Sequence, residues 1–316
     1  MAGKRTVLLT GASGFIGANL VSFLEKREDL HLRLQVHQRP PPPEWTARGH
    51  EIVRGTMTDR GALKAWVAGA DTIVHAAADT DVKRALENPL HALDVNCRAT
   101  MELLDEARAA GVRRFVYINS ARIYGKPQYL PIDEEHPFFI EDPYGASKLA
   151  GGLYTDLYHR LYKMPTVNLV VFSVYGPGQQ PQGNTGVVAI FCRRVIEGKD
   201  ITIFGDGSFQ RDPLHVRDLC AAIELAVDSE RAAGQRYNVG TGRGVSMQEF
   251  ADVAIRVGAE LGHRGTKVKY AEALPGDVSN CADIRKITEE LGFRPKVALE
   301  DGVREYLEWY ARHKTG

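Results

Sequence analysis

A tyrosine and a lysine, Tyr144 and Lys148, lie four residues apart in the segment DPYGASKLAGG. On a helix, this spacing places both side chains on one face, one turn apart. A lysine ammonium beside a phenol favours the phenolate, so we expect the pKa of Tyr144 to lie below the usual value of about 10. Ser120 ends an apolar run at 113–120, and its hydroxyl could orient a substrate oxygen. Together the three residues predict proton transfer at an oxygen atom near neutral pH.

Three glycines follow the first apolar run of the chain. Gly11, Gly14 and Gly17 stand in LLTGASGFIGANL, where an amphipathic stretch begins at Phe15. Glycines permit a tight turn, a close approach of the backbone to a pyrophosphate, and close packing of helix on strand. The N-terminus of the following helix would present N–H groups and the positive end of its dipole to the phosphates. The pattern predicts a dinucleotide site.

Strand-like runs that alternate with helix-length segments must position these residues. The apolar runs are at 6–11, 32–36, 51–55, 71–78, 113–120, 166–174 and 236–242. The longest helical segments between them are expected at about 89–110 and 147–162. Strands spaced by helices predict an α/β fold with a doubly wound parallel sheet, covered on both faces. After Tyr175 the elements become shorter and less regular, and the Pro40–Pro43 run suggests a stiff surface connection.

Composition excludes several classes of protein. Forty basic residues balance forty acidic ones, so bulk charge predicts neither nucleic-acid nor anionic-membrane binding. The apolar stretch near the N-terminus is too short for a signal peptide or a membrane span. Four scattered cysteines without a CxxC motif fit free thiols in a reducing cytoplasm, with no disulfide framework and no metal site.

The full set of motifs resembles the extended short-chain dehydrogenases/reductases, and more narrowly their NAD-dependent epimerase/dehydratase family of nucleotide-sugar enzymes. The glycine turn is followed by Asn96 in DVN, by Ser120 four residues before Tyr124-Gly125, and by the Tyr144–Lys148 pair. The likeness continues through YGPGQ, FGDGSFQRDPLHVRDL, YNVGTG and PGDVSNCADIRK, and it covers essentially the whole chain.

This resemblance implies a Rossmann domain made of residues 1–175 and about 213–242, and a smaller α/β substrate lobe made of about 176–212 and 243–316. Tyr144 would be the acid/base, Lys148 would hold the nicotinamide ribose, and Ser120 would position the substrate oxygen. A homodimer through the two long helices is usual in the family. The implied cofactor contacts are Gly11, Ser13, Gly14, Phe15, Ile16, Gly17, His37, Arg39, Met57, Ala76, Ala77, Asn96 and Lys148. The candidate substrate contacts are Asp79, Arg122, Asp142, Ser173 and Arg211, the last matching the family's diphosphate-binding arginine.

Two departures from the family concern the substrate. The 4,6-dehydratases carry an Asp–Glu pair directly after the hydroxyl residue, where this chain has Ala121 and Arg122, so water elimination is not expected. Two customary diphosphate partners are also replaced. The Arg and Asn of one family motif correspond here to Val170 and Ser173. The Arg of a second motif is replaced by Leu274.

A third departure concerns the cofactor. An acid about twenty residues after the glycine turn would bond the adenosine ribose and repel a 2′-phosphate. That position holds His37, followed by Gln38 and Arg39. Arg39 could pair with a phosphate through a bidentate fork, with His37 assisting, which favours NADP(H). The alternative is a solvated basic turn, with NAD as the cofactor.

Additional acids flank the expected cleft. Asp79 and Asp81 follow HAAA, and Glu141 and Asp142 precede Tyr144. If these side chains line the pocket, they favour a cationic amino-sugar over a dianionic diphosphate; otherwise they are ordinary surface acids.

These observations favour an NADPH-dependent ketoreductase that acts on a nucleotide-sugar or an amino-sugar. The alternative is an NAD-dependent nucleoside-diphosphate-sugar epimerase, which returns the hydride to the other face of the sugar. A non-catalytic dinucleotide-binding regulator is a third class, although such proteins usually lose the tyrosine or the lysine.

Overall fold

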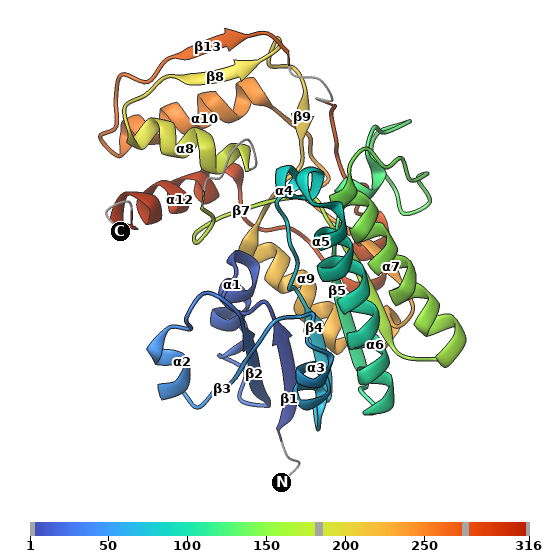
Figure 1. The fold of residues 1–316 in the computed structure, drawn as a ribbon. Helices are drawn as coiled ribbons and strands as arrows, with labels where there is room; N and C mark the ends of the chain where they lie inside the picture. Colours follow the sequence, from blue (N-terminus) through green and yellow to red (C-terminus); the bar gives the residue numbers. More distant parts are fainter. Residues whose placement is uncertain (1–3, 181–185, 274–277, 314–316) are drawn as a thin grey trace.

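The central element of the fold is a seven-stranded, all-parallel sheet (Figure 1). The computed structural model describes residues 4–180, 186–273 and 278–313. The strands lie in the order β11-β6-β5-β4-β1-β2-β3. Their bounds are β1 Arg5–Thr10, β2 Leu30–Val36, β3 Glu51–Arg54, β4 Thr72–His75, β5 Arg114–Ser120, β6 Thr166–Val171 and β11 Arg236–Val239. The strand order reverses between β1 and β4, and ligands of such sheets bind in the crevice at this point.

Helices cover both faces of the sheet, as the sequence predicts. Within β1, Val7 and Leu9 pack in one hydrophobic cluster while Leu8 packs in another. The first cluster contains α1 (Phe15–Leu24) and α9 (Val216–Asp228). The cluster of Leu8, on the opposite face of the sheet, contains α3 (Arg60–Val67), α6 (Ala99–Ala109) and α7 (Pro143–Tyr162). Two buried faces explain why these strands read as nearly continuous apolar runs.

The helical segment expected at about 89–110 is divided. It consists of α5 (Pro89–Leu93), a π-helical turn η1 (Asp94–Arg98) and α6, and a short helix α4 (Val82–Glu87) precedes it. The π-helical turn contains Asn96 and Cys97, which are both buried. Such turns are rare and frequently lie at functional sites.

The strand expected at 166–174 is also divided. The chain leaves the sheet after Val171, and β7 (Ser173–Tyr175) pairs instead with β10 (Pro213–His215). The change of sheet carries the chain into a second, separate hydrophobic cluster.

The second cluster is built mainly from three helices, which Figure 1 shows above the sheet. They are α8 (Val187–Ile196), α10 (Met247–Glu260) and α12 (Leu299–His313). Two short strand pairs flank them, β8 (Ile201–Phe204) with β13 (Val268–Ala271) and β9 (Gln210–Arg211) with β12 (Val245–Ser246).

Two smaller elements differ from the sequence expectations. The proline run leads into a short helix, α2 (Pro43–Ala47), which is anchored by the buried Trp45. Helix α11 (Arg285–Leu291) falls inside the range expected for the substrate lobe, but its Ile287 packs in the cluster of α1 and α9. Across the described ranges, none of the helices combines the length and the apolar character that crossing a membrane requires.

Candidate active site

The glycine turn forms a cradle that only glycines fit. Gly11 has φ +71°, and a Cβ there would lie 2.8 Å from the backbone nitrogen of Ala77. A Cβ on Gly17 would lie 2.2 Å from the carbonyl oxygen of Gly11. Gly14 is the N-cap of α1 and brings no capping side chain, so the first N–H groups of the helix remain available to a ligand. This turn fits the pyrophosphate of a dinucleotide.

The remaining residues predicted to contact the cofactor differ in their surroundings. Ser13, Phe15 and Ile16 are partly buried around the first turn of α1. Ala76 and Ala77 follow β4, directly beside Gly11. Met57 differs from them, because its side chain is buried in the hydrophobic cluster of α3 and α6.

Gln35 supports the glycine turn, and the sequence analysis missed it. Its side chain is 1% exposed; its Oε1 accepts from the N–H of Gly11 at 2.8 Å, and its Nε2 donates to the carbonyl of Gly55 at 2.8 Å. In the run at 32–36, Gln35 alternates with the apolar Leu34 and Val36, and this pattern by itself predicts an outward-facing side chain. An amide between Leu34 and Val36, on a strand buried on both faces, was the available signal.

Beyond Gln35, the chain turns to the surface. His37 and Arg39 lie just after β2 and are exposed. Within the described residues, neither side chain forms an ion pair, so both can reach a ligand at this edge of the sheet.

Helix α7 holds the tyrosine and the lysine. Asp142 caps the helix by accepting from the N–H of Gly145 at 2.7 Å, and Pro143 begins it. One turn apart, Tyr144 is 9% exposed and Lys148 is 2% exposed. The predicted shared helix face is therefore present, and it points inward.

The side chain of Lys148, from α7, reaches the end of β5, where Ser120 lies. The ammonium of Lys148 donates to the carbonyl of Ile118 at 2.7 Å and lies 4.0 Å from the centre of the Tyr117 ring. Ser120 ends β5, and its hydroxyl lies close enough to the phenol of Tyr144 to lower the phenol's pKa. Strand β5 and helix α7 thus bring the three predicted residues together.

The pKa of Tyr144 corrects the sequence expectation. Burial raises it above the usual 10, and the hydrogen bond with Ser120 opposes this only in part. Burial also lowers the pKa of Lys148 to about 7, so its positive charge is only partly present at neutral pH. The expected lowering of the phenol's pKa by the ammonium is therefore wrong for the protein chain by itself, because desolvation is the larger effect.

Asn96 connects the cofactor side of the site to α7. Its Oδ1 accepts from the N–H of Asp79 at 2.8 Å, and its Nδ2 donates to the hydroxyl of Ser147 at 3.0 Å. The π-helical turn places this buried amide between the two segments, so its function here is to hold backbone and helix in place.

The acids near Tyr144 are already paired, which corrects the amino-sugar expectation. Asp79 is buried, accepts from Nε of Arg84 at 2.8 Å, and lies 3.5 Å from His91. Asp142 caps α7 and forms an ion pair with Nε of Arg122 at 3.1 Å. Both carboxylates and Arg122 act electrostatically on the phenol of Tyr144, so all three lie near it. Since each acid has its own cation, a free anionic pocket for an amino-sugar is not formed.

The other two flanking acids differ from one another. Asp81 caps α4 by accepting from the N–H of Arg84 at 3.1 Å, and Glu141 is exposed.

Arg211 lies at the junction between the sheet and the second hydrophobic cluster. Its guanidinium is stacked 4.9 Å from the centre of the Phe209 ring and donates to the carbonyl of Val278. The N–H of Ser173 donates to the carbonyl of Asp212 at 3.1 Å, which places Ser173 beside the residue that follows Arg211. Val170 is fully buried in β6, and Leu274 lies outside the described residues.

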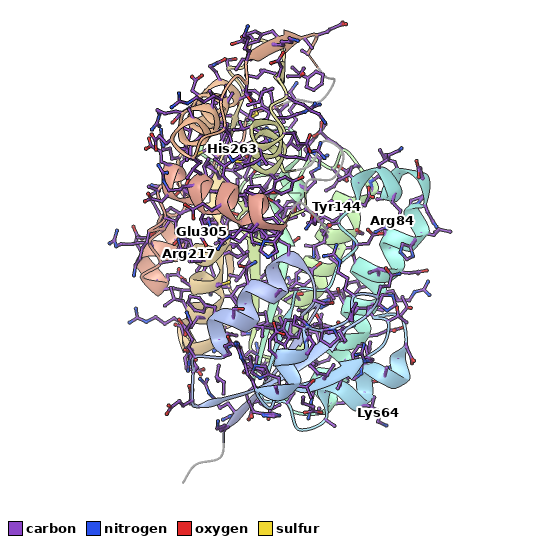
Figure 2. The ribbon with its side chains drawn as sticks, turned by 90° about the vertical axis from the view of Figure 1, so that its left-hand side faces the viewer. Lys64, Arg84, Tyr144, Arg217, His263 and Glu305 are labelled. Atoms are coloured by element: carbon purple, nitrogen blue, oxygen red, sulfur yellow. The ribbon has the colours of Figure 1, made fainter. Side chains whose placement is uncertain are left out.

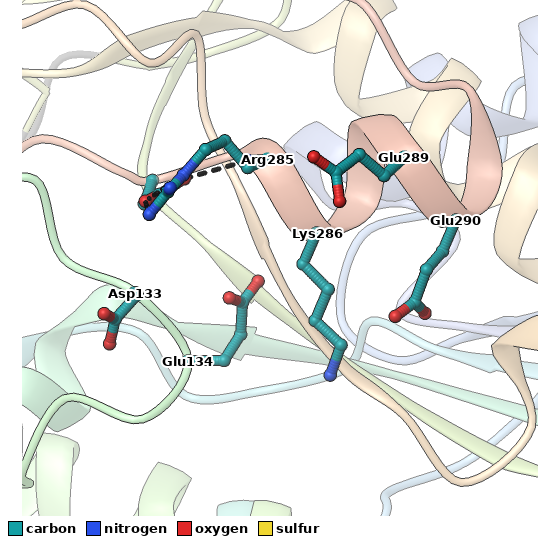
Figure 3. Close-up of a pocket in the computed structure, with 7 residues that line it drawn as sticks. Asp133, Glu134, Arg285, Lys286, Glu289 and Glu290 are labelled. Atoms are coloured by element: carbon teal, nitrogen blue, oxygen red, sulfur yellow. Dashed lines mark hydrogen bonds and ion pairs between the residues drawn. The ribbon is translucent and has the colours of Figure 1, made fainter.

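A charged hollow of about 240 Å³ lies elsewhere, between the loop at 133–134 and α11 (Figure 3). Its walls are Asp133, Glu134, Asp283, Arg285, Lys286, Glu289 and Glu290. None of these residues belongs to the candidate site. In the hollow, Asp283 and Arg285 neutralise one another, and Glu134 accepts from the N–H of Asn238 at 2.7 Å.

Comparisons with known proteins agree with this geometry. The sequence pattern described as the NAD dependent epimerase/dehydratase family matches residues 7–240. A UDP-glucose 4-epimerase from Mycolicibacterium smegmatis is 34% identical over 320 residues, covering 98% of this chain and 99% of the relative. A dTDP-glucose 4,6-dehydratase from Streptomyces niveus is 32% identical over 326 residues, covering 98% and 94%. The crystal structure of the Thermus thermophilus UDP-glucose 4-epimerase in complex with NAD is similar with a TM-score of 0.85 and 30% identity, covering 97% of this chain and 99% of that one.

Proposed function

Because the chain belongs to the NAD dependent epimerase/dehydratase family, we propose that it is an NAD-dependent epimerase of nucleoside-diphosphate sugars. The observation that carries the proposal is that the buried Tyr144 and Lys148 lie close to the partly buried Ser120, in a chain whose glycine turn fits a dinucleotide. Similarity to a UDP-glucose 4-epimerase over nearly the whole chain supports inversion at the C4 carbon of the sugar.

The residues of the site suit a reversible oxidation. Bound NAD would supply the acceptor, and then the donor, of a hydride. Ser120 and Tyr144 would hold the reacting hydroxyl, and Oη of Tyr144 would take its proton and later return it. Lys148 would hold the nicotinamide ribose, with its ammonium fixed by the carbonyl of Ile118. Return of the hydride to the opposite face of the sugar inverts the carbon.

The ketoreductase that the sequence favoured receives less support than its epimerase alternative. Epimerases and dehydratases, not reductases, supply the similar proteins described above. Dehydration is also disfavoured, since Ala121 and Arg122 stand where the dehydratases carry acids, and Arg122 is paired with Asp142. An intact Tyr144–Lys148 pair argues against a regulator without activity.

The experiment that tests the function uses UDP-glucose and dTDP-glucose with no added cofactor, in D₂O. We expect the C4 epimer to form, without solvent deuterium at C4, because the same hydride leaves and returns. Chromatography and NMR of the sugar measure both results. In a separate assay with NADPH and a 4-keto-sugar nucleotide, oxidation of NADPH in proportion to product, with no epimer formed from UDP-glucose, would instead establish the ketoreductase.

The cofactor preference depends on Arg39. We propose NAD as the cofactor, but no acid near Arg39 is available to repel a 2′-phosphate. Arg39→Asp is expected to weaken NADP(H) relative to NAD at least tenfold, about 1.4 kcal/mol, because the new carboxylate repels the phosphate. Titration of both cofactors into the variant measures the ratio. Lys64→Asp on α3 makes the same charge change away from the cradle and should leave the ratio unchanged (Figure 2).

Two outcomes would change the cofactor assignment. A wild-type protein that prefers NADP(H) tenfold or more would return the reductase as the leading function. An unchanged ratio in Arg39→Asp would show that this side chain does not reach the adenosine ribose.

The chain divides into two parts because the hydrophobic cluster of α8, α10 and α12 is separate from the clusters on the two faces of the sheet. We propose that residues 1–175 and about 213–242, joined by α11, bind the cofactor. Residues 176–212 and most of 243–316 would bind the nucleotide part of the substrate. Arg211, at the junction, is the proposed partner of the substrate diphosphate.

Exposed apolar side chains on α5 and α7 support the proposal of a homodimer. Leu90 is 70% exposed, Leu161 is 61% exposed, and α5 packs beside α7 (Figure 1). The exposed apolar side chains of these two helices are Leu90, Leu93, Leu153, Tyr154, Leu161 and Tyr162. Light scattering should give twice the chain mass of 34.9 kDa, and Leu161→Asp should return the monomer mass. Tyr270→Asp, on β13, is the control and should stay dimeric.

A further inference from the structure

A chain of buried hydrogen bonds runs beneath the candidate active site. Oγ1 of Thr10 lies 2.7 Å from Nδ1 of His75, and Nε2 of His75 lies 2.9 Å from Oγ1 of Thr100. The N–H of Ala77 donates to Thr10 Oγ1 at 3.2 Å, and Thr100 Oγ1 donates to the carbonyl of Asn96 at 2.8 Å. Thr10, His75 and Thr100 are completely buried.

The two backbone groups at its ends fix the direction of every bond in this chain. An amide N–H can only donate and a carbonyl can only accept. Thr100 uses its one proton for the carbonyl of Asn96, so it can only accept from Nε2–H of His75. Nδ1 of the neutral ring is then unprotonated, and Thr10, which accepts from Ala77, donates to it. Burial lowers the pKa of His75 to about 3, which keeps the ring neutral. One tautomer alone satisfies all of these groups.

From Asn96 the bonds continue to the catalytic helix. The side chain of Asn96 donates to the hydroxyl of Ser147 at 3.0 Å, and this hydroxyl donates to the carbonyl of Tyr144 at 2.8 Å. The same amide holds both backbone groups of Asp79. The backbone beside the glycine turn and the backbone of Tyr144 are thus connected through a single series of buried bonds.

A second contact leads from the histidine to the lysine. The rings of His75 and Tyr117 lie 5.6 Å apart, and the ammonium of Lys148 lies 4.0 Å from the centre of the Tyr117 ring. A displaced His75 would therefore disturb the support of Lys148 as well as the loop at Ala77.

We infer that His75 and Thr100 are positioning residues, which hold the Ala77 loop against the glycine turn and keep it in register with the helix of Tyr144. The inference rests on the proposed function in one respect: it takes NAD as the ligand of the cradle. Neither residue touches substrate in this scheme, since both act through Ala77 and Asn96.

The chain offers a matched pair of threonines for the test. Thr100 and Thr155 are both completely buried in helices, and each donates to the carbonyl four residues earlier, at 2.8 and 2.9 Å. Of the two, only Thr100 also takes a hydrogen bond from a histidine among the residues that the structure describes. Thr→Val keeps the volume at either position, so the difference between the two variants isolates the bond to His75.

We expect Thr100→Val to bind NAD at least fivefold more weakly than Thr155→Val, because Nε2–H of His75 is left buried without an acceptor. Isothermal titration with NAD measures this without any turnover. Urea unfolding should show a larger loss of stability in Thr100→Val than in Thr155→Val, because the unsatisfied Nε2–H also costs the folded state free energy, so the titrations are made where both variants are fully folded. Thr100→Ser restores the hydroxyl and should bind NAD within twofold of wild type.

Two results would overturn the inference. One is an equal NAD affinity in Thr100→Val and Thr155→Val. The other is a Thr100→Ser protein as impaired as Thr100→Val, which would make lost packing the cause. Because NAD affinity decides the matter, failure here is distinguishable from failure of the proposed reaction, which the epimer assay decides.

Discussion

Tyr144→Phe is expected to reduce turnover by a factor of 10² to 10⁴ or more while the protein still binds NAD, because a positioned acid/base contributes an effect of this size. The substitution removes one hydroxyl and almost no volume from a residue that is 9% exposed. Ser120 lies near this hydroxyl, and its Oγ keeps the hydrogen bond that it accepts from the N–H of Arg122 at 3.2 Å. Loss of activity should therefore come from chemistry and not from unfolding.

The pH profile gives this prediction a second measurement. Burial raises the pKa of Tyr144 above 10, so the chain by itself keeps the phenol protonated at neutral pH. Wild-type kcat/KM should rise with pH as more phenolate becomes available, and the residual activity of Tyr144→Phe should lose that rise. A nearby positive charge on the bound cofactor would move the rise to lower pH without removing it.

Tyr158→Phe is the matched control for this experiment. Tyr158 lies on the same helix and is 8% exposed, and its ring packs edge-on against Tyr162 at 5.1 Å. Its kcat should stay within twofold of wild type. If Tyr144→Phe retains activity within tenfold of wild type, Tyr144 is not the acid/base and the proposed mechanism fails.

Local patterns in the sequence were sufficient for the cradle and for the tyrosine–lysine pair. Gly11 and Gly17 were identified because positive φ and close approach exclude other residues, and these constraints are local. Tyr144 and Lys148 were identified because helical spacing alone determines their common face. The doubly wound parallel sheet followed from the family resemblance and from the alternation of strands with helices, whereas the order of its strands came from the structure.

Features that depend on contacts between distant segments were not predictable. Asp79 and Asp142 looked like free acids, but Arg84 and Arg122 neutralise them in the fold. The pKa of Tyr144 moved opposite to the expectation because its burial cannot be read from neighbouring residues in the sequence. In each case, a group's environment, and not its type, determined its role.

Gln35 and His75 are buried polar residues whose hydrogen-bond partners could not be predicted from the sequence. Both are polar residues on strands, where alternation predicts an outward side chain for Gln35 and gives no partner for His75. The sheet is buried on both faces, so each must find hydrogen bonds inside the protein. Gln35 finds them at Gly11 and Gly55, and His75 at Thr10 and Thr100.

Lys148→Met is expected to lower both turnover and NAD affinity at least tenfold, because one ammonium serves the ribose and the acid/base at once. Unlike Tyr144→Phe, this change should therefore affect binding. Titration with NAD and the epimer assay measure the two losses separately. Unchanged NAD affinity would reduce Lys148 to a buried lysine held by the carbonyl of Ile118.

The same variant should gain relative stability at low pH, since burial of the charged form of Lys148 opposes folding. Burial lowers its folded-state pKa to about 7, whereas the unfolded value is 10.5. Below pH 7 the lysine is charged in both states, so the full cost of burying the charge is present. As pH rises from 7 toward 10.5, the folded protein releases this proton first, and the cost is progressively removed.

The stability advantage of Lys148→Met over wild type should therefore be largest near pH 6 and shrink by about 2 kcal/mol by pH 9. Urea unfolding of both proteins at the two pH values measures the change. Lys83→Met is the control, since Lys83 is exposed on α4 and its variant should differ from wild type equally at both pH values. A constant difference for Lys148→Met would show that the ammonium stays charged in the folded protein. The expected result would show that Lys148 costs stability at neutral pH. The chain would then keep this lysine because its ammonium serves the ribose and the phenol.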